Sequence, residues 1–152
     1  LTADIDLTGS EYGKKFTKDQ AMQWYMIVPG EHGSLTEGYQ GTFDGKFHTV
    51  SAVTVSIPSG YNVQGGFFGV VVGTVQNLYL DKINVNVSAT HWLTGGGISG
   101  QMSGDAVIKN CGIKSGVIAT NTSVSKDFAA LGGITGDTKN NGIIENCFNR
   151  LT

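Results

Sequence analysis

The feature that most restricts the fold of this 152-residue chain is a motif that recurs three times between residues 65 and 149. Each copy has two glycines enclosing two residues, then a spacer, then a short segment in which an asparagine interrupts alternating apolar residues. The copies are Gly65–Gly69 with Thr74–Leu80, Gly96–Gly100 with Val107–Ile113, and Gly132–Gly136 with Ile143–Asn149. Motifs repeated every roughly 20 to 50 residues are typical of solenoids and related folds, in which each unit packs on the next.

A fainter copy of the motif precedes these three. The composition of most of the chain favours strands over helices. The fainter copy spans His48–Val55 and has Ala52 where the other copies have asparagine. Short stretches rich in Val, Ile and Thr are broken by glycine and asparagine, which is typical of strands. The one helix candidate is Thr17–Trp24, because Thr17 and Gln20 have the spacing of a capping box.

Repeats this short cannot bury an apolar face alone, so we expect the copies to stack as parallel strands about 4.8 Å apart. The predicted fold is all-β, a parallel β-helix (β-solenoid) of about four to five coils. It is predicted to form one domain, 1–152, with an N-terminal capping region at 1–40 and repeat coils at 41–152. Alternation along the motif places eight side chains inside: Val75, Leu78, Leu80, Ile108, Cys111, Ile113, Ile144 and Cys147.

Asparagines and glycines at equivalent positions of the copies predict the corners of the coils. Asparagine tolerates left-handed backbone, and its side-chain amide can bond the amide one coil away. We therefore expect a structural ladder of Asn77, Asn110 and Asn146. We also expect positive φ at the glycines that close each motif, which are Gly69, Gly100 and Gly136.

Charge and cysteine content exclude several kinds of partner. The chain has 10 basic and 12 acidic residues and a net charge of −2, so it lacks the basic excess that attracts nucleic acid. Its apolar runs are too short for membrane insertion. Cys111 and Cys147 occupy equivalent positions, which is compatible with a disulfide or with two free buried thiols, and we expect the thiols. Neither cysteine has a histidine at ligand spacing, so no metal or other cofactor is predicted.

Two carboxylates near the start of the chain are candidates for a catalytic or cation site. Asp4 and Asp6 alternate with apolar residues and therefore face one side of a strand. Paired carboxylates can bind Ca²⁺ or act as acid and base in glycoside hydrolysis. The alternative is a solvated or capping polar row, which we favour, and no catalytic residue is predicted.

The chain resembles bacterial surface proteins that carry GLUG repeats. The resemblance rests on Leu1–Leu7, on Trp24 with Pro29–Gly30, on Gly41–Gly45 followed by His48–Val50, and on the three Gly-apolar-x-Gly elements. It departs from the family pattern at Phe47, where glycine is usual, and at Ala52, where asparagine is usual. The resemblance implies a right-handed parallel β-helix in a secreted or cell-surface bacterial protein. Such repeats occur in adhesins, in immunoglobulin A peptidases and in polysaccharide-active proteins.

Aromatic residues are the best indication of a binding surface. Trp92 and His91 are expected in a loop at Ser88–Thr94, and a second loop is expected at Val117–Asp127. Tyr79 and Phe148 fall at an outward position of one strand, two coils apart, and should flank a notch about 10 Å long. Rings of this kind stack on the apolar faces of sugars, so these four residues are the predicted carbohydrate-binding residues.

The predicted function is therefore a non-catalytic adhesion or ligand-binding module, with a glycan or a host surface protein as its partner. The alternatives are a segment of a polysaccharide-active enzyme or of a surface peptidase, and a structural spacer. Leu151 and Thr152 follow a repeat strand without a polar cap. We therefore expect the C-terminal coil to stack on further repeats or on another chain.

Overall fold

The structure is a computed structural model that describes residues 1–8, 38–120 and 127–152. Within these ranges all regular structure is β-strand, and every strand pairing is parallel. The predicted helix at Thr17–Trp24 and most of the predicted capping region lie outside the described residues. None of the described elements is a helix of the length and apolarity needed to cross a membrane.

The described strands form three complete coils of five strands each. The first coil contains β2 (Thr42–Asp44), β3 (Thr49–Ser51), β4 (Thr54–Ile57), β5 (Asn62–Gly65) and β6 (Phe68–Val71). The second contains β7 (Thr74–Gln76), β8 (Tyr79–Asp81), β9 (Ile83–Val87), β10 (Trp92–Gly96) and β11 (Ser99–Met102). The third contains β12 (Val107–Lys109), β13 (Gly112–Ile113), β14 (Gly116–Ala119), β15 (Phe128–Gly132) and β16 (Thr135–Thr138).

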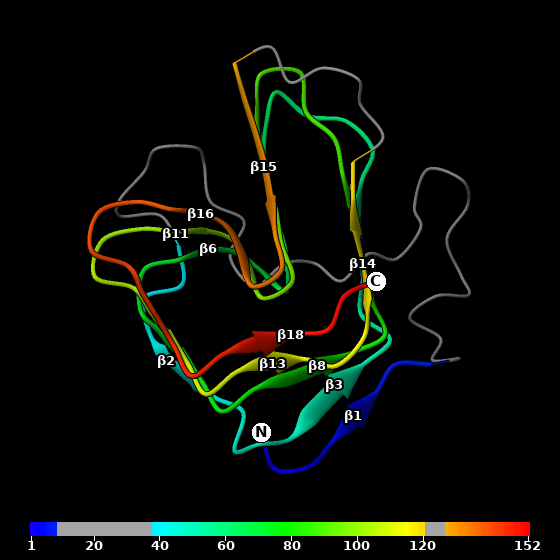
Figure 1. Cartoon of the computed structure of the whole chain (residues 1–152), viewed down its shortest axis with the longest axis vertical. Helices are drawn as coiled ribbons and strands as arrows, with labels where there is room; N and C mark the ends of the chain where they lie inside the picture. Colours follow the sequence, from blue (N-terminus) through cyan, green and yellow to red (C-terminus); the bar gives the residue numbers. More distant parts are fainter. Residues whose placement is uncertain (9–37, 121–126) are drawn as a thin grey trace.

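Three further short strands lie above and below these coils. β17 (Ile143–Glu145) and β18 (Phe148–Asn149) stack on β12 and β13, and β1 (Ile5–Asp6) pairs with β3. Each strand thus pairs with its counterpart one coil away, which produces five parallel sheets that run along the stack (Figure 1). The fold is the predicted all-β solenoid, with about three coils where four to five were expected.

The core is built from the inward columns that alternation predicted. Val75 and Ile108 are in register and fully buried, as are Leu78 and Cys111 at the next inward position. Leu80 and Ile113 follow in the same way. Burial of such columns provides most of the stabilisation of a solenoid, because each coil removes the apolar surface of the next one from water.

The first coil departs from the sequence alignment of the repeats. β2 pairs with β7 in the register Asp44 to Gln76, so the counterpart of Asn77 is Gly45 and not Ala52. Ala52 follows β3 and lies at a different corner, level with Lys82, and both residues have positive φ. The apparent substitution of asparagine by alanine was therefore a misalignment.

Two predicted loops and three predicted corners are also corrected. Of the loop predicted at Ser88–Thr94, residues 92–94 belong to β10. Of the loop predicted at Val117–Asp127, residues 117–119 belong to β14. Gly69, Gly100 and Gly136 lie inside β6, β11 and β16, and none has positive φ. Close approach explains the glycine instead: a Cβ on Gly100 would lie 2.5 Å from the backbone nitrogen of Gly65. Gly100 and Gly136 thus allow β11 and β16 to pass close to the strand ends at Gly65 and Gly95 of the preceding coil.

Candidate ligand-binding surface

Two of the predicted binding residues meet on the outer face of the sheet β1-β3-β8-β13-β18. Tyr79 is in register with Gly112, and Gly112 with Phe148. The rings of Tyr79 and Phe148 have centroids 6.0 Å apart and planes inclined at 43°. The ring of Phe148 leans over Gly112, where any Cβ would overlap it. The predicted open notch of about 10 Å is therefore closed, because the two rings reach each other across the glycine.

A third ring extends this pair and was not singled out from the sequence as a binding residue. The Phe47 ring lies 6.2 Å from that of Tyr79, and the Phe47 residue is 58% exposed. Phe47 has left-handed backbone, with φ of 63°, and its N–H donates to the carbonyl of Asn77 at 2.7 Å. Phe47, Tyr79 and Phe148 together form what we call the aromatic column. Phe47 was missed because it lies in an irregular turn, outside the repeat pattern.

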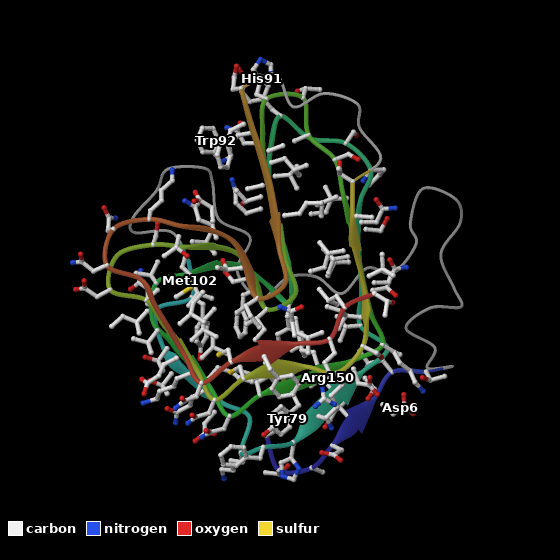
Figure 2. The ribbon with its side chains drawn as sticks, viewed as in Figure 1. Asp6, Tyr79, His91, Trp92, Met102 and Arg150 are labelled. Atoms are coloured by element: carbon white, nitrogen blue, oxygen red, sulfur yellow. The ribbon has the colours of Figure 1, made fainter. Side chains whose placement is uncertain are left out.

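Two cationic side chains lie over rings of the aromatic column. The Lys114 Nζ atom is 5.2 Å from the Tyr79 ring centroid and donates a hydrogen bond to Thr49 Oγ1 at 2.8 Å. The Arg150 guanidinium carbon is 5.3 Å from the Phe148 ring centroid. Such cation–π contacts orient the long side chains along the sheet. The column therefore combines apolar ring surface with hydrogen-bond donors; Tyr79 and Arg150 are labelled in Figure 2.

The two candidate carboxylates, Asp4 and Asp6, have local structural partners. Asp4 accepts a hydrogen bond from the Thr49 N–H at 2.8 Å and lies 3.1 Å from His48 Nδ1. These contacts, the Thr49 bond first, lower the pKa of Asp4. The pKa of Asp6 is lowered mainly by the N–H of Thr8, which donates to it at 2.8 Å. Across the described residues, no three His, Cys, Asp or Glu side chains are grouped so as to hold a metal ion.

His91 and Trp92, the other two predicted binding residues, belong to a second group of rings that we call the tip cluster. Trp92 stacks on Phe128 of the next coil, with ring centroids 4.3 Å apart, and Lys139 Nζ is 5.0 Å from the Trp92 ring. His91 stacks on Tyr61 at 3.8 Å, and Tyr61 is 64% exposed. Figure 2 shows His91 and Trp92 at the opposite end of the coil from Tyr79. The four predicted residues therefore form two separate surfaces.

Phe128 was missed because it lies between the loop expected at Val117–Asp127 and the repeat motif that begins at Gly132. It is in register with Trp92, and the glycine pairs at 96–97 and 132–133 mark equivalent strand ends, whereas Gly65 is in register with Gly95. Counting back from those pairs would have placed Phe128 beside Trp92. The partly buried and stacked rings indicate that much of this cluster serves packing between coils.

The three ladder asparagines are joined by hydrogen bonds and all have left-handed backbone. Their φ angles are 54° at Asn77, 52° at Asn110 and 50° at Asn146. Asn146 Nδ2 donates to Asn110 Oδ1 at 3.4 Å, and Asn110 Nδ2 donates to Asn77 Oδ1 at 3.2 Å. Asn77 Nδ2 in turn donates to Asp44 Oδ1 at 3.0 Å. The ladder thus ends on a carboxylate that the sequence analysis did not include.

Asp44 is held ionised by several hydrogen bonds. Its carboxylate also accepts from the Lys46 N–H at 2.8 Å and from Gln76 Nε2 at 3.0 Å. These bonds lower the pKa of Asp44, with the Lys46 N–H as the largest cause, followed by Asn77 and Gln76. An anionic acceptor strengthens each of these bonds relative to a neutral one.

Cys111 and Cys147 are free thiols at stacked positions. Cys111 is buried, and its pKa is raised by its hydrogen bond with Cys147 and by burial. Cys147 is half-buried, and its pKa is lowered to about 7, mainly by the hydrogen bond from Cys111. The outer thiol is therefore the more reactive of the two, because the thiolate is the nucleophile.

The aromatic column and the tip cluster are the two surfaces whose chemistry bears on ligand binding. No protein-family model, curated protein or solved structure matches the chain.

Proposed function

We propose that this chain is a non-catalytic adhesion or ligand-binding module of a secreted or cell-surface bacterial protein with GLUG-type repeats, and that its ligand is a glycan. The observation that carries the proposal is the aromatic column, in which three rings follow one another on the outer face of a rigid parallel sheet. Phe47 and Phe148 are 58% and 38% exposed, respectively.

The chemistry of the column suits a sugar better than a uniformly apolar partner. Aromatic faces pack against the C–H faces of pyranose rings, and ring side chains fixed on a sheet lose little conformational freedom on binding. Lys114 and Arg150, which lie beside the rings, supply N–H donors for sugar hydroxyl groups. A ligand lying along the column would meet rings and donors together.

The contacts of the acidic residues favour a binding module over an enzyme segment. A glycoside hydrolase needs two carboxyl groups that face a shared substrate, one as acid and one as base or nucleophile. Asp4 and Asp6 are instead engaged with backbone N–H groups of Thr49 and Thr8. Asp44 is engaged with the ladder.

Glycan-array binding of the wild-type protein, compared with that of four single-residue variants, tests the proposal. Phe47→Ala and Tyr79→Ala remove rings of the aromatic column, and we expect each to weaken binding about tenfold or more, equivalent to about 1.4 kcal/mol. Tyr61→Ala and Trp92→Ala alter the tip cluster and should leave binding unchanged. Because Phe47 and Tyr61 are both exposed, that pair compares the two surfaces with little risk to folding.

Two other results of this experiment would reject the proposal. Loss of binding only in Tyr61→Ala or Trp92→Ala would move the site to the tip cluster and reject the column. Absence of any glycan signal from the wild-type protein would reject the glycan proposal in favour of a spacer or a protein-binding surface.

A further inference from the structure

The last coil leaves inward-facing positions exposed. Ile144 is in register with Ile108, yet it is 45% exposed where Ile108 is fully buried. Cys147 is half-buried at the level where Cys111 is fully buried. Leu131 packs over Gly95 toward the core and is 43% exposed. The surface formed by Leu131, Ile144, Asn146 and Cys147, which we call the open coil face, is thus a cross-section of the core.

Backbone groups are open at the same face. Within the described ranges, β15, β16, β17 and β18 are each the last strand of their sheet, with a partner on one side only. A parallel strand edge presents alternating N–H and C=O groups that another strand can pair with. Apolar side chains and strand edges therefore call for the same occupant, a further parallel β-coil.

The asparagine ladder has a direction that specifies this occupant further. Each ladder asparagine donates its amide N–H toward the preceding coil, and Asn77 and Asn110 also accept through their oxygens from the following coil. Asn146 donates to Asn110, and its Oδ1 accepts from none of the described residues. The open end of the ladder is consequently an acceptor and requires a donor.

We propose that the open coil face is a stacking interface for a further parallel β-coil that places an asparagine over Asn146 and apolar side chains over Ile144 and Cys147. The new asparagine would donate its Nδ2 to Asn146 Oδ1 and continue the ladder. The partner is thus defined by an amide donor at one corner as well as by apolar side chains.

A second copy of this chain, stacked head to tail, does not supply that donor. Its first coil carries β1 on the outer side of β3, and the Leu1 amino group donates to the Asp44 carbonyl at 2.7 Å, so these residues would meet the open coil face before β2 does. The ladder residue beside Gly45 is Asp44, whose carboxylate can only accept hydrogen bonds. The first coil of a second copy therefore offers Asn146 no ladder donor, and the ladder disfavours self-stacking.

Inserting one more coil into the full chain tests the proposal. Asn149 is in register with Ile113, so Arg150 follows β18 as Lys114 follows β13. A second copy of residues 115–150 placed between Arg150 and Leu151 therefore continues the helical path. Three versions differ only in the copied asparagine, which is retained or carries Asn146→Asp or Asn146→Ala. The copied cysteine carries Cys147→Ala, so that the original Cys147 is the only half-buried thiol.

The readouts are the thermal midpoint and the alkylation rate of the original Cys147 at pH 7.5. The version with asparagine should have a higher midpoint than the uninserted chain and should slow alkylation about tenfold or more. The alanine version should slow the alkylation of Cys147 less than the asparagine version does. The aspartate version should protect the original Cys147 least at pH 7.5. At pH 4 its protection should improve relative to that of the alanine version, because a protonated carboxyl can donate to Asn146.

Hydrogen exchange at the amides of β17 and β18 shows whether the inserted coil has docked. Failure to dock in all three versions would overturn the proposal, as would equal protection by asparagine and aspartate at pH 7.5. Alkylation that slows with rising concentration of the uninserted chain would show that a second copy occupies the face, which also overturns it.

Discussion

The ladder asparagines each hold a left-handed corner and donate a hydrogen bond to the preceding coil. Asn110, the middle residue, donates to Asn77 and accepts from Asn146. Asn110→Ala should lower the free energy of unfolding by about 1–3 kcal/mol, because one amide loses its acceptor, another loses its donor, and alanine must adopt positive φ. Urea titrations of Asn110→Ala and Asn146→Ala measure this, and the terminal variant should lose less. Equal losses would contradict a ladder that acts through its hydrogen bonds.

The lowered pKa of Asp44 leads us to expect that the stability of the fold depends on pH. Its pKa in the folded protein is lowered below the ordinary value of 3.8. As pH falls, the Asp44 carboxylate therefore binds a proton in the unfolded chain before it does so in the folded one. Its stabilisation of the folded protein is present above about pH 4 and is lost as pH falls through the folded pKa. Asp4 and Asp6 act in the same direction. Urea midpoints between pH 6 and pH 2.5 should fall less steeply in Asp44→Asn than in the wild-type protein.

At the level of strands and corners, the glycines inside β11 and β16 predict a packing effect. Gly100→Ala should destabilise the protein by about 1–3 kcal/mol, because the new Cβ would press on the backbone of Gly65, which cannot move aside as a side chain would. Gly41→Ala is a matched control, since a Cβ there meets only the ring of Tyr39. Thermal unfolding of both variants measures the difference, and a similar midpoint for the two would contradict the close-approach explanation.

The sequence predicts those elements that obey the repeat. Apolar alternation around each asparagine is local and periodic, so the inward columns and the shared outward position of Tyr79 and Phe148 could be predicted, although the contact between their rings could not. The first coil could not be aligned, because its corner uses Gly45 with the neighbouring Asp44 where later coils use one asparagine. Phe47 follows another left-handed residue, Lys46, and this turn is set by contacts with the next coil. Tertiary contacts of that kind leave no period in a sequence.

At the scale of the whole molecule, stability should vary along the stack. Each coil contacts only its neighbours, so local opening is easiest at a coil with one neighbour. Amides of β17 should therefore exchange with deuterium on the order of tenfold faster than those of β12, which lies between two strands. Native-state exchange followed by mass spectrometry measures this gradient. Uniform protection of β7, β12 and β17 would show instead that the stack opens as one unit.

The direction of the ladder also has a consequence for the order in which the chain is made. Synthesis proceeds from the N-terminus, so Asp44 is in place before Asn77, and Asn77 before Asn110. Every asparagine that emerges brings a donor to an acceptor already set in a finished corner. Coils can therefore be added one at a time on a growing template, with no ladder bond that has to wait for a residue not yet synthesised.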